Sequence, residues 1–434
     1  MLRTSSARKS EKERKRRKLL VFKYSIDEIV KEAKRKGYFA AEDYPGLKLS
    51  LDEFQKLVRK LGRIPRKKPE EVIEKTMAVR AVNALRKGTV LAESVTAYSV
   101  GRERLLEAFK KDLAEVSRKR SLVRFVNADL GEGKTHALSL LREIAFRMDF
   151  PVSLVTLSQS ECPLHDFLLV YNKVMWSIRT REERQRPALE NIFQRWLDMA
   201  RNRGEDQAGE LVKHLRGQNN VLRENVVNAL AAYCNATSII SPDKERQHVI
   251  LDWFSGGRVY ASDLRKAAIY SQISEHNALE MLSILSGLFR HLGYKGMCIL
   301  FDEAEAIHSL SHYSHRDRAY ANLLSITRAA EKYPNCYFLY STTPSFFDTF
   351  SNFWGSEYRI RGEHIYELER LSADELKTLG EKIITIYRTA YGWEKPTGID
   401  ASVTKLAQAG GDQRIGDFVR GVIAFLDEKS GRAS

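Results

Sequence analysis

Cysteine is scarce in this chain, with 4 residues among 434 and no Cys-x-x-Cys pair. Scattered thiols of this kind are typical of a reducing compartment, where they serve as small core residues. Long apolar runs are also missing, and without a stretch of about 18 apolar residues we expect no membrane span. The basic N-terminus lacks the apolar segment of a secretory signal peptide. The sequence therefore predicts a cytoplasmic protein with no membrane attachment.

Acidic residues are scarce in the first fifth of the chain. Residues 1–90 contain 26 Lys and Arg but 12 Asp and Glu, whereas the remaining residues contain 45 and 44. The net charge of +15 is therefore concentrated at the N-terminal end. Such a basic field attracts polyanions, so we expect DNA as a partner. The alternatives are a solvated tail and a helical adaptor for protein contacts, because no recognition-helix signature is present.

The length of the chain is sufficient for two or three domains. Capping boxes at Ser25–Glu28 and Ser50–Glu53 predict two short N-terminal helices, and a third is expected over Pro69–Lys87. A third capping box, Ser372–Glu375, predicts a helical C-terminal segment. We expect a disordered basic tail (1–20), a helical basic N-terminal domain (21–95), an α/β core (96–370) with a helical insertion at about 160–293, and a helical lid (371–434).

Five short apolar runs predict the strands of the core. They are Leu122–Val126, Val152–Leu157, Met297–Asp302, Asn335–Tyr340 and His364–Leu368. Runs of this length with helical patterns between them are typical of a parallel sheet.

The first of these strands leads into a phosphate-binding pattern. FVNADLGEGKTHALSLL contains A-x-x-x-x-G-K-T from Ala128 to Thr135, with alanine in place of the usual first glycine. Two glycines let backbone N–H groups turn inward beside a helix N-terminus, which favours an anion. Lys134 would reach the β- and γ-phosphates, and the Thr135 hydroxyl would hold Mg²⁺. The alternative is a structural turn. The expected cradle is Asp129, Leu130, Gly131, Glu132, Gly133, Lys134, Thr135 and His136.

A second chemical pattern is MCILFDEAEAI, in which an apolar strand delivers Asp302 and Glu303 at its carboxyl end. Open parallel sheets bind ligands at this edge. We expect Asp302 to support Mg²⁺ and Glu303 to polarise the attacking water of phosphoryl transfer. An acidic pair at the end of a strand can also have no catalytic role. This pair, however, follows the loop that contains Lys134 along the chain, which is the order expected for the two phosphate motifs.

A third strand ends in hydroxyl groups, Ser341, Thr342 and Thr343. A hydroxyl between the two motifs can sense the γ-phosphate, and Thr342 is the expected residue, with Thr343 the second choice. The alternative is a simple turn before Pro344.

Arginines later in the chain are candidates for a cation at the γ-phosphate. Arg359 and Arg361 precede the last strand, and Arg414 lies in the C-terminal helical segment. Because arginines are numerous here, each of the three can equally be a surface residue.

Three histidines, His308, His312 and His315, invite a metal interpretation, since their spacing could place them on one helix face. No Cys or carboxylate partner has metal-site spacing around them, so a solvated loop is the favoured alternative to zinc.

Several stretches together resemble a known family. They are AVNALRKGTV, YSVGRERLLEAFKKDLAEV, VRFVNADLGEGKTH, LVTLSQSECPLHDF, GYKGMCILFDEAE and STTPSFF. They are similar to the ATP-binding proteins of bacteriophage-exclusion (BREX) systems, BrxC/BrxD type, over roughly residues 78–428. The resemblance implies an AAA+-like P-loop ATPase core with a helical lid, the cofactors ATP and Mg²⁺, a role in phage defence, partner defence proteins and a homo-oligomer.

The resemblance also implies roles for particular residues. Tyr98, Val100, Gly101 and Arg102 look like the segment that frames the adenine. Lys134 and Thr135 match the first phosphate motif, and Asp302 and Glu303 match the second. Thr342 is similar to a first sensor and Arg414 to a lid sensor, while Arg359 or Arg361 resembles the finger that acts on a neighbouring subunit.

Three functions remain open on the sequence. The first is a DNA-associated AAA+-like ATPase of a phage-defence system that hydrolyses ATP, at a low rate or rapidly, to control assembly on DNA and recruitment of partners. The second is an initiator- or transposition-type DNA-bound loader or regulator. The third is a scaffold that binds ATP without hydrolysing it.

Overall fold

The computed structural model describes residues 26–36, 53, 56–57, 60, 73–118, 120–203, 220–237, 242–332, 335–350, 364–394, 396, 398–409 and 414–432. It divides into two compact units, Met1–Ile73 and Glu74–Ser434. The expected boundary at residues 95 and 96 falls inside the second unit. Residues 1–20, Ser25 and Ser50 lie outside the described residues, so the structure does not test the basic tail or the first two capping boxes.

The first unit contains helix α2 (Ile26–Lys36), which begins directly after Ser25 as predicted. Its Ile29 and Val30 are buried, and so is Leu57. An ion pair of 2.6 Å joins Asp27 of α2 to Lys60, although both side chains are largely exposed. The described residues of this unit thus include three buried apolar side chains and an exposed ion pair.

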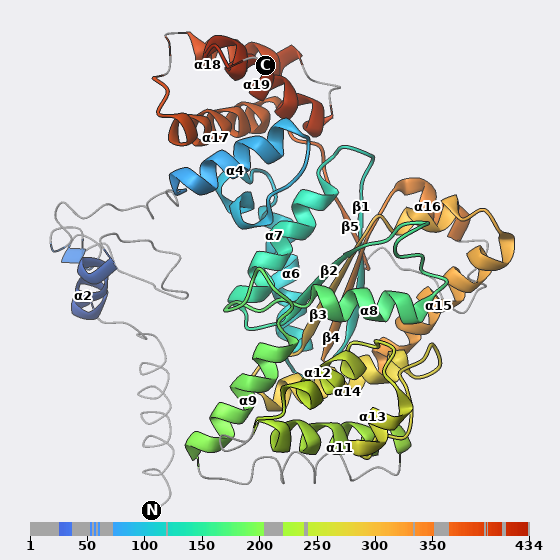
Figure 1. The fold of residues 1–434 in the computed structure, drawn as a ribbon. Helices are drawn as coiled ribbons and strands as arrows, with labels where there is room; N and C mark the ends of the chain where they lie inside the picture. The colour runs from blue at the N-terminus through green and yellow to red at the C-terminus, as the bar shows by residue number, and fades with distance from the viewer. Residues whose placement is uncertain are drawn as a thin grey trace, which may run out of the picture. The chain divides into compact units, whose positions relative to one another are not determined.

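The second unit is built around a five-stranded sheet with the order β2-β3-β4-β1-β5 (Figure 1). Every pairing is parallel, which confirms the predicted α/β fold with a parallel sheet. The strands are β1 (Leu122–Asn127), β2 (Val152–Thr156), β3 (Met297–Asp302), β4 (Cys336–Thr342) and β5 (Ile365–Glu367). Because β4 lies between β1 and β3, the chain segments after these two strands meet across the end of β4.

Both faces of the sheet are covered, so its strands read as continuous apolar runs. In β3, Met297, Ile299 and Phe301 enter one hydrophobic core, and Cys298 and Leu300 enter the other. Helices α6 (Glu103–Val116) and α7 (Lys134–Arg147) form the second core. The first core contains residues of α8 (Phe167–Ser177), α9 (Leu189–Arg203), α11 (Val221–Ala236), α12 (Lys244–Phe254), α13 (Ala261–Lys266), α14 (Ala278–His291), α15 (Tyr313–Lys332) and α16 (Pro344–Phe350). The segment expected as an insertion thus shares its core with the sheet.

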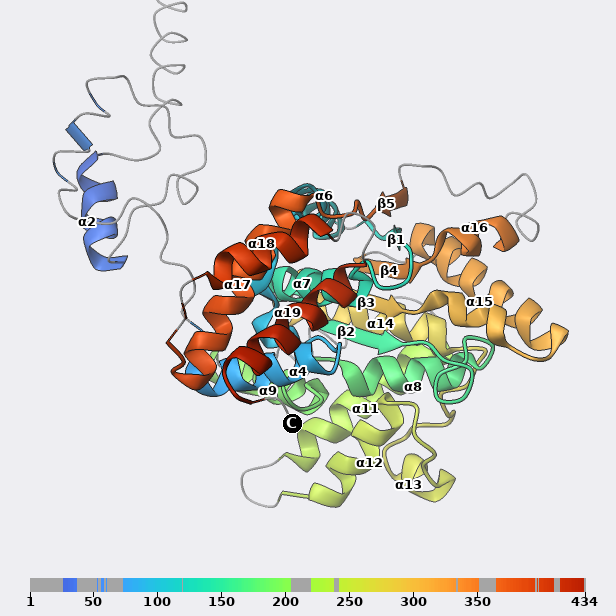
Figure 2. The same ribbon diagram turned by 90° about the horizontal axis from the view of Figure 1, so that it is seen from above.

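The C-terminal helices form a separate layer with α4 (Lys75–Arg86), as Figure 2 shows from above. They are α17 (Ala373–Tyr391), α18 (Ile399–Ala409) and α19 (Ile415–Lys429). The capping box predicted at Ser372 is present, with Glu375 as its second member. Asp427 of α19 accepts hydrogen bonds from Nε and Nη2 of Arg86 in α4, both at 2.8 Å, so α4 belongs to the same layer. We refer to α4, α17, α18 and α19 as the lid layer. Among the described helices, none has the length and apolarity to span a membrane.

Candidate functional site

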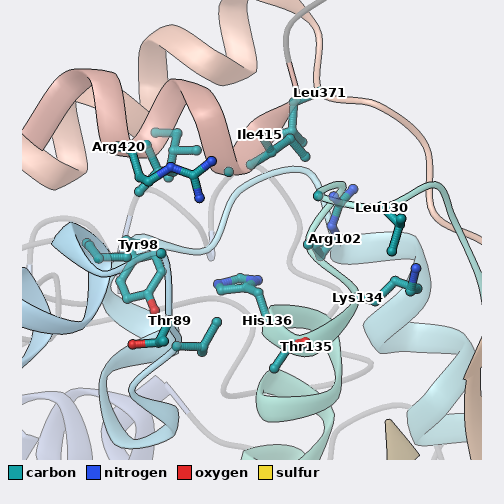
Figure 3. Close-up of a pocket in the computed structure, with 18 of the residues that line it drawn as sticks. Thr89, Tyr98, Arg102, Leu130, Lys134, Thr135, His136, Leu371, Ile415 and Arg420 are labelled. Carbon is teal, nitrogen blue, oxygen red and sulfur yellow. The ribbon is translucent and has the colours of Figure 1, made fainter. Parts of the chain in front are cut away.

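A cavity of about 270 Å³ lies between the carboxyl edge of the sheet and the lid layer (Figure 3). Its floor is the segment after β1, from Leu130 to His136, with Asp302, Glu303 and Glu305 at the β3 end. Its opposite wall is mostly apolar, with Arg420 of α19 as a charged exception, and the apolar residues are Leu85, Leu371, Leu379, Ile415 and Val419. The cavity therefore has a polar end at the strand edge and an apolar end under the lid, which is the usual character of a small-molecule site.

The loop after β1 has the geometry that its glycines predict. Gly131 has a φ of +85° and Gly133 a φ of +88°, a region that residues with a Cβ rarely adopt. Gly133 is the N-cap of the 14-residue helix α7, so the positive end of that helix dipole faces the loop. The Ala128 N–H donates to the Thr342 carbonyl at 3.2 Å, which fixes the start of the loop to β4.

Lys134 is buried, and its amine crosses the loop. Nζ donates to the Ala128 carbonyl at 3.0 Å and lies 3.3 Å from Oε1 of Glu305. Glu305 follows Glu303 by two residues, in the 3-10 segment η3 (Ala304–Ser309). The left-handed backbone of Glu303, with a φ of +58°, starts the turn that brings Glu305 to the lysine. Sequence reasoning missed Glu305, although the repeated acidic residue in DEAE was a visible signal.

The two expected motifs meet at Asp302. The Thr135 hydroxyl donates to Oδ2 of Asp302 at 2.7 Å. Ser341 donates to Oδ1 of the same carboxylate, and the Glu303 N–H donates to the Ser341 hydroxyl at 2.9 Å. A hydroxyl and a carboxylate oxygen side by side are the hard oxygen ligands that Mg²⁺ takes together with substrate phosphates, so this pair fits the ion.

The hydroxyl at the end of β4 that touches the acidic pair is therefore that of Ser341. The Thr342 side chain is fully buried and its hydroxyl donates to the Val126 carbonyl at 3.4 Å. Thr343 is half-buried and pairs with the hydroxyl of Ser345. The sensor role of Thr342 stays a prediction, and the structure adds Ser341 as a second hydroxyl at this edge.

Glu303 lines the cavity and is exposed. Partial desolvation raises the pKa of its carboxyl, and the nearby charges of Asp302 and Glu305 raise the pKa further, while Lys134 opposes them. A carboxylate whose pKa is raised accepts a proton more readily, which suits a group that polarises water.

The segment expected to frame the adenine lies at the apolar end. Tyr98, Val100 and Arg102 line the cavity. Gly101 has a φ of +68°, and a Cβ there would lie 2.5 Å from Oε1 of Glu375, so the turn requires glycine. Buried Arg102 donates to the Glu369 carbonyl at 2.9 Å and to the Glu132 carbonyl at 3.3 Å. It therefore links the loop to the segment that precedes the lid.

Of the three arginines expected near the γ-phosphate, the structure describes only Arg414. Arg414 lies directly before α19 with its side chain against Gly131, where an added Cβ would be 3.0 Å from the Arg414 Cδ. The Gly416 N–H donates to the Gly131 carbonyl at 3.1 Å, so the start of α19 touches the loop. Arg359 and Arg361 lie outside the described residues, and the finger role remains a prediction for both.

Comparison with known protein families identifies the chain. Residues 73–427 match the family model described as BREX system ATP-binding protein BrxC/D. The chain belongs to this family. The resemblance seen in the sequence is thereby confirmed, and ATP is the ligand that membership of this BREX family supports. No curated protein matches the chain.

The structure of this BREX ATP-binding protein shows one cavity residue and one contact of the loop that the sequence did not indicate. Arg420 of α19 lines the cavity, and a Cβ on Gly88 would lie 2.7 Å from its Nη1. Arg370 has its Nε 3.2 Å from Oε1 of the buried Glu132, inside the loop. Both arginines come from the segments around the lid, about 240 residues or more from the loop in sequence, so no local pattern could reveal them.

The three histidines, for which zinc is the less favoured interpretation, do not lie on one element. His308 lies in η3, whereas His312 precedes α15 and His315 lies within it, so the three do not share one helix face. His315 stacks on His165 with ring centroids 4.1 Å apart, and His308 stacks on Phe346. Over the described ranges, no group of three His, Cys, Asp or Glu residues is arranged to hold a metal ion.

Proposed function

We propose that this BREX ATP-binding protein hydrolyses ATP in the cavity beneath its lid. The observation that carries the proposal is the hydrogen bond of 2.7 Å between Thr135 and Asp302. It joins the phosphate-type loop after β1 to the acidic end of β3, two segments more than 160 residues apart. Phosphoryl transfer needs these two groups at one place, since charge must be neutralised where the phosphate reacts.

Each residue then has a distinct task. The loop backbone and Lys134 bind the β- and γ-phosphates, and Thr135 and Asp302 would hold Mg²⁺, which supplies charge neutralisation when bound. Glu303 orients and polarises the attacking water, and its raised pKa supports this assignment. Thr342 or Ser341 contacts the γ-phosphate from the end of β4.

The nucleoside occupies the apolar end of the cavity. Tyr98 and Val100 form one wall, and Leu379 and Val419 of the lid form the other. In this arrangement the base is enclosed by both the core and the lid. Arg414, at the start of α19, would report on the loop as a lid sensor, while Arg359 or Arg361 would act on the ATP of a neighbouring subunit in a homo-oligomer.

DNA is the second ligand that we propose, bound by the first unit. Residues 1–73 contain 22 Lys and Arg against 11 Asp and Glu. Phosphate contacts dominate nucleic-acid affinity, so an excess of this size favours binding. ATP turnover would then control assembly on DNA and recruitment of other BREX proteins. An initiator-type loader and a non-hydrolysing scaffold are the competing functions.

Steady-state ATP turnover, measured with and without DNA, tests the proposal. Glu303→Gln should retain ATP binding by calorimetry but lose turnover, because an amide cannot polarise water in the same way. Lys134→Ala should lose binding. Glu161→Gln, an exposed carboxylate outside the cavity lining, is the matched control. Wild-type protein that binds ATP tightly but never turns it over would establish the scaffold function instead.

A further inference from the structure

The sheet has a second edge that takes no part in the chemistry described above. The cavity lies at the carboxyl ends of the strands, so the amino ends form the opposite edge. Because all strands run in the same direction, the segments that precede them meet at this amino edge. They include residues 117–118 and 120–121 before β1, 148–151 before β2 and 292–296 before β3. The amino edge is therefore a composite surface away from the cavity.

Hydrogen bonds connect these segments. Nη1 of Arg290, in the last turn of α14, donates both to the Ser117 carbonyl and to the Lys295 carbonyl. The Lys295 N–H in turn donates to the Asp149 carbonyl at 3.0 Å. The chain that follows α14 is thus hydrogen-bonded to the chain that follows α7, and α14 itself to the chain that follows α6. Side chains from the three segments consequently lie on one surface.

Positive charge is concentrated at this surface. Arg195 of α9 also lies there, with its guanidinium carbon 5.3 Å from the ring centroid of Tyr294. The nearby carboxylates are those of Glu115, Asp149 and Glu182. Residues 74–434 contain 49 Lys and Arg against 45 Asp and Glu, so a local excess of three is most of the excess of the second unit. The cations, which we call the amino-edge cluster, are Arg118, Arg120, Arg147, Arg195, Arg290 and Lys295.

Helix ends explain only part of this charge. Helices α6, α7 and α14 end at this edge, and the negative ends of their dipoles attract cations in the last turn. Arg147 and Arg290 are such last-turn residues. Arg118, Arg120 and Lys295 follow the helices, and their side chains are exposed. Their positive charge is therefore accessible to an anionic partner.

The composition of the surface favours phosphate groups over a folded protein. Protein interfaces contain aromatic or aliphatic anchors at their centre. Among the described residues, none of the exposed large apolar side chains lies in the three segments. Five of the six cations are arginines, whose planar guanidinium groups can bind two phosphate oxygens at once. The regular row of phosphates on a DNA duplex can contact cations from separate segments together.

We propose that the amino edge of the sheet is a second contact surface for duplex DNA, which the amino-edge cluster binds through the phosphate backbone. The inference rests on the DNA ligand proposed for the first unit. Six cations opposed by three carboxylates are too weak to hold a duplex without residues 1–73. In the full chain, a duplex bound by the first unit is presented to this surface at a high effective concentration. The surface then adds affinity and leaves the nucleotide cavity open.

The test measures the affinity of the full-length protein for a labelled duplex by fluorescence anisotropy, between about 50 and 200 mM salt. A triple variant, Arg118→Gln with Arg120→Gln and Lys295→Gln, removes three exposed cations outside the cavity lining. The dissociation constant should rise about 10-fold or more. The log–log dependence on salt should become shallower by about 2 to 3, because each lost phosphate contact removes about 0.9. An unchanged ATP affinity by calorimetry shows that the variant is folded.

Two further variants make the outcome decisive. The matched control, Lys244→Gln with Arg258→Gln and Arg265→Gln, removes the same charge from exposed positions in and between α12 and α13. Its duplex affinity and salt dependence should be close to those of wild type. Asp149→Asn removes one of the three carboxylates and should tighten duplex binding, which a misfolded variant would not do.

Two results for the duplex would overturn the proposal. One is equal affinity in the triple variant and wild type, and the other is an equal loss in the triple variant and the matched control. Poly-glutamate is the comparison ligand: if the triple variant loses affinity for it but not for the duplex, the surface binds an acidic protein segment instead. If wild type does not bind the duplex at all, the DNA ligand of the first unit falls too. If wild type binds and the triple variant binds equally, the second surface alone is refuted.

Discussion

Glu305→Gln is the substitution whose effect the structure defines most sharply. The Glu305 carboxylate lies 3.3 Å from Nζ of Lys134, and the two side chains are 18% and 8% exposed. Lys134 is the residue proposed to bind the β- and γ-phosphates. A carboxylate therefore occupies the position beside the amine that a phosphate oxygen must take or share. We expect Glu305→Gln to increase the affinity for ATP.

The size of the effect follows from the charges involved. Two unit charges on opposite sides of one amine, roughly 6 Å apart, repel by about 3 kcal/mol at an effective dielectric constant of about 20. Salt and the exposed mouth of the cavity screen part of this repulsion, which leaves ~1–2 kcal/mol, or about tenfold in the dissociation constant. The ligand-free variant should also be less stable, because Lys134 becomes a buried cation without its ion pair.

Calorimetry with ATP in EDTA and in Mg²⁺ separates the possible roles of Glu305, and thermal melting measures the second effect. The melting temperature of Glu305→Gln should be lower than that of wild type without ATP, and the increase caused by saturating ATP should be larger. Glu161→Gln is the control. If Glu305→Gln binds ATP more weakly than wild type only in the Mg²⁺ buffer, Glu305 belongs to the metal shell. If Glu305→Gln and wild type bind ATP with equal affinity in the EDTA buffer and in the Mg²⁺ buffer, the carboxylate does not oppose the phosphate. Either result refutes the reasoning.

Four other outcomes are expected. Glu303→Gln should melt at a higher temperature than wild type at pH 7, because the raised pKa of Glu303 makes its ionised form unfavourable in the folded state. The difference in melting temperature should disappear below pH 4.5, the usual pKa of the group, because Glu303 is then protonated in both the folded and the unfolded state. Gly133→Ala, at a φ of +88°, should lower the unfolding free energy by ~1–2 kcal/mol in a denaturant titration and weaken ATP binding. Asp427→Asn should cost ~1–2 kcal/mol in the same titration, since it removes the ionic partner of Arg86, while Glu428→Gln, at an exposed neighbouring carboxylate, should cost little. Removal of residues 1–73 should abolish the salt-dependent part of DNA binding in an anisotropy assay but leave ATP affinity intact, and unchanged DNA binding would contradict the proposed DNA site.

The strands were predictable because a covered parallel sheet leaves a strong local signal. Met297–Asp302 matches β3 at both ends, and the predicted Leu122–Val126 differs from β1 by one residue. The capping box at Ser372 was equally local, since one hydroxyl and one carboxylate three residues later define it. The bounds of the last predicted strand, His364–Leu368, were less accurate. Only Ile365–Glu367 of this segment pairs with β1. This edge strand is short, and its neighbours decide where it ends.

Contacts that depend on strand order could not be read from the sequence. Ser341 contacts Asp302 because β4 lies between β1 and β3 in the sheet. This strand order cannot be predicted from the local sequence of any one strand. Glu305 reaches Lys134 because a left-handed residue and a 3-10 segment follow β3, where helical spacing would have turned the side chain elsewhere. The positions of the three histidines depend on the same segment, since η3 ends at Ser309 before α15 begins at Tyr313.

The contacts of the loop explain why this site is built from both the core and the lid layer. Arg102 joins the Glu132 carbonyl to the Glu369 carbonyl, and Arg370 pairs with the Glu132 carboxylate. The amide of Gly416 donates to the loop at Gly131. Three connections thus run from two loop residues, Gly131 and Glu132, to the chain around α17 and α19. A ligand can shift a conformational equilibrium only when it contacts the two states differently. Phosphates would accept hydrogen bonds from the N–H groups of the same loop whose carbonyl oxygens, at Gly131 and Glu132, accept from Gly416 and Arg102. We therefore expect a ligand bound to the loop to change the contacts that hold the lid layer.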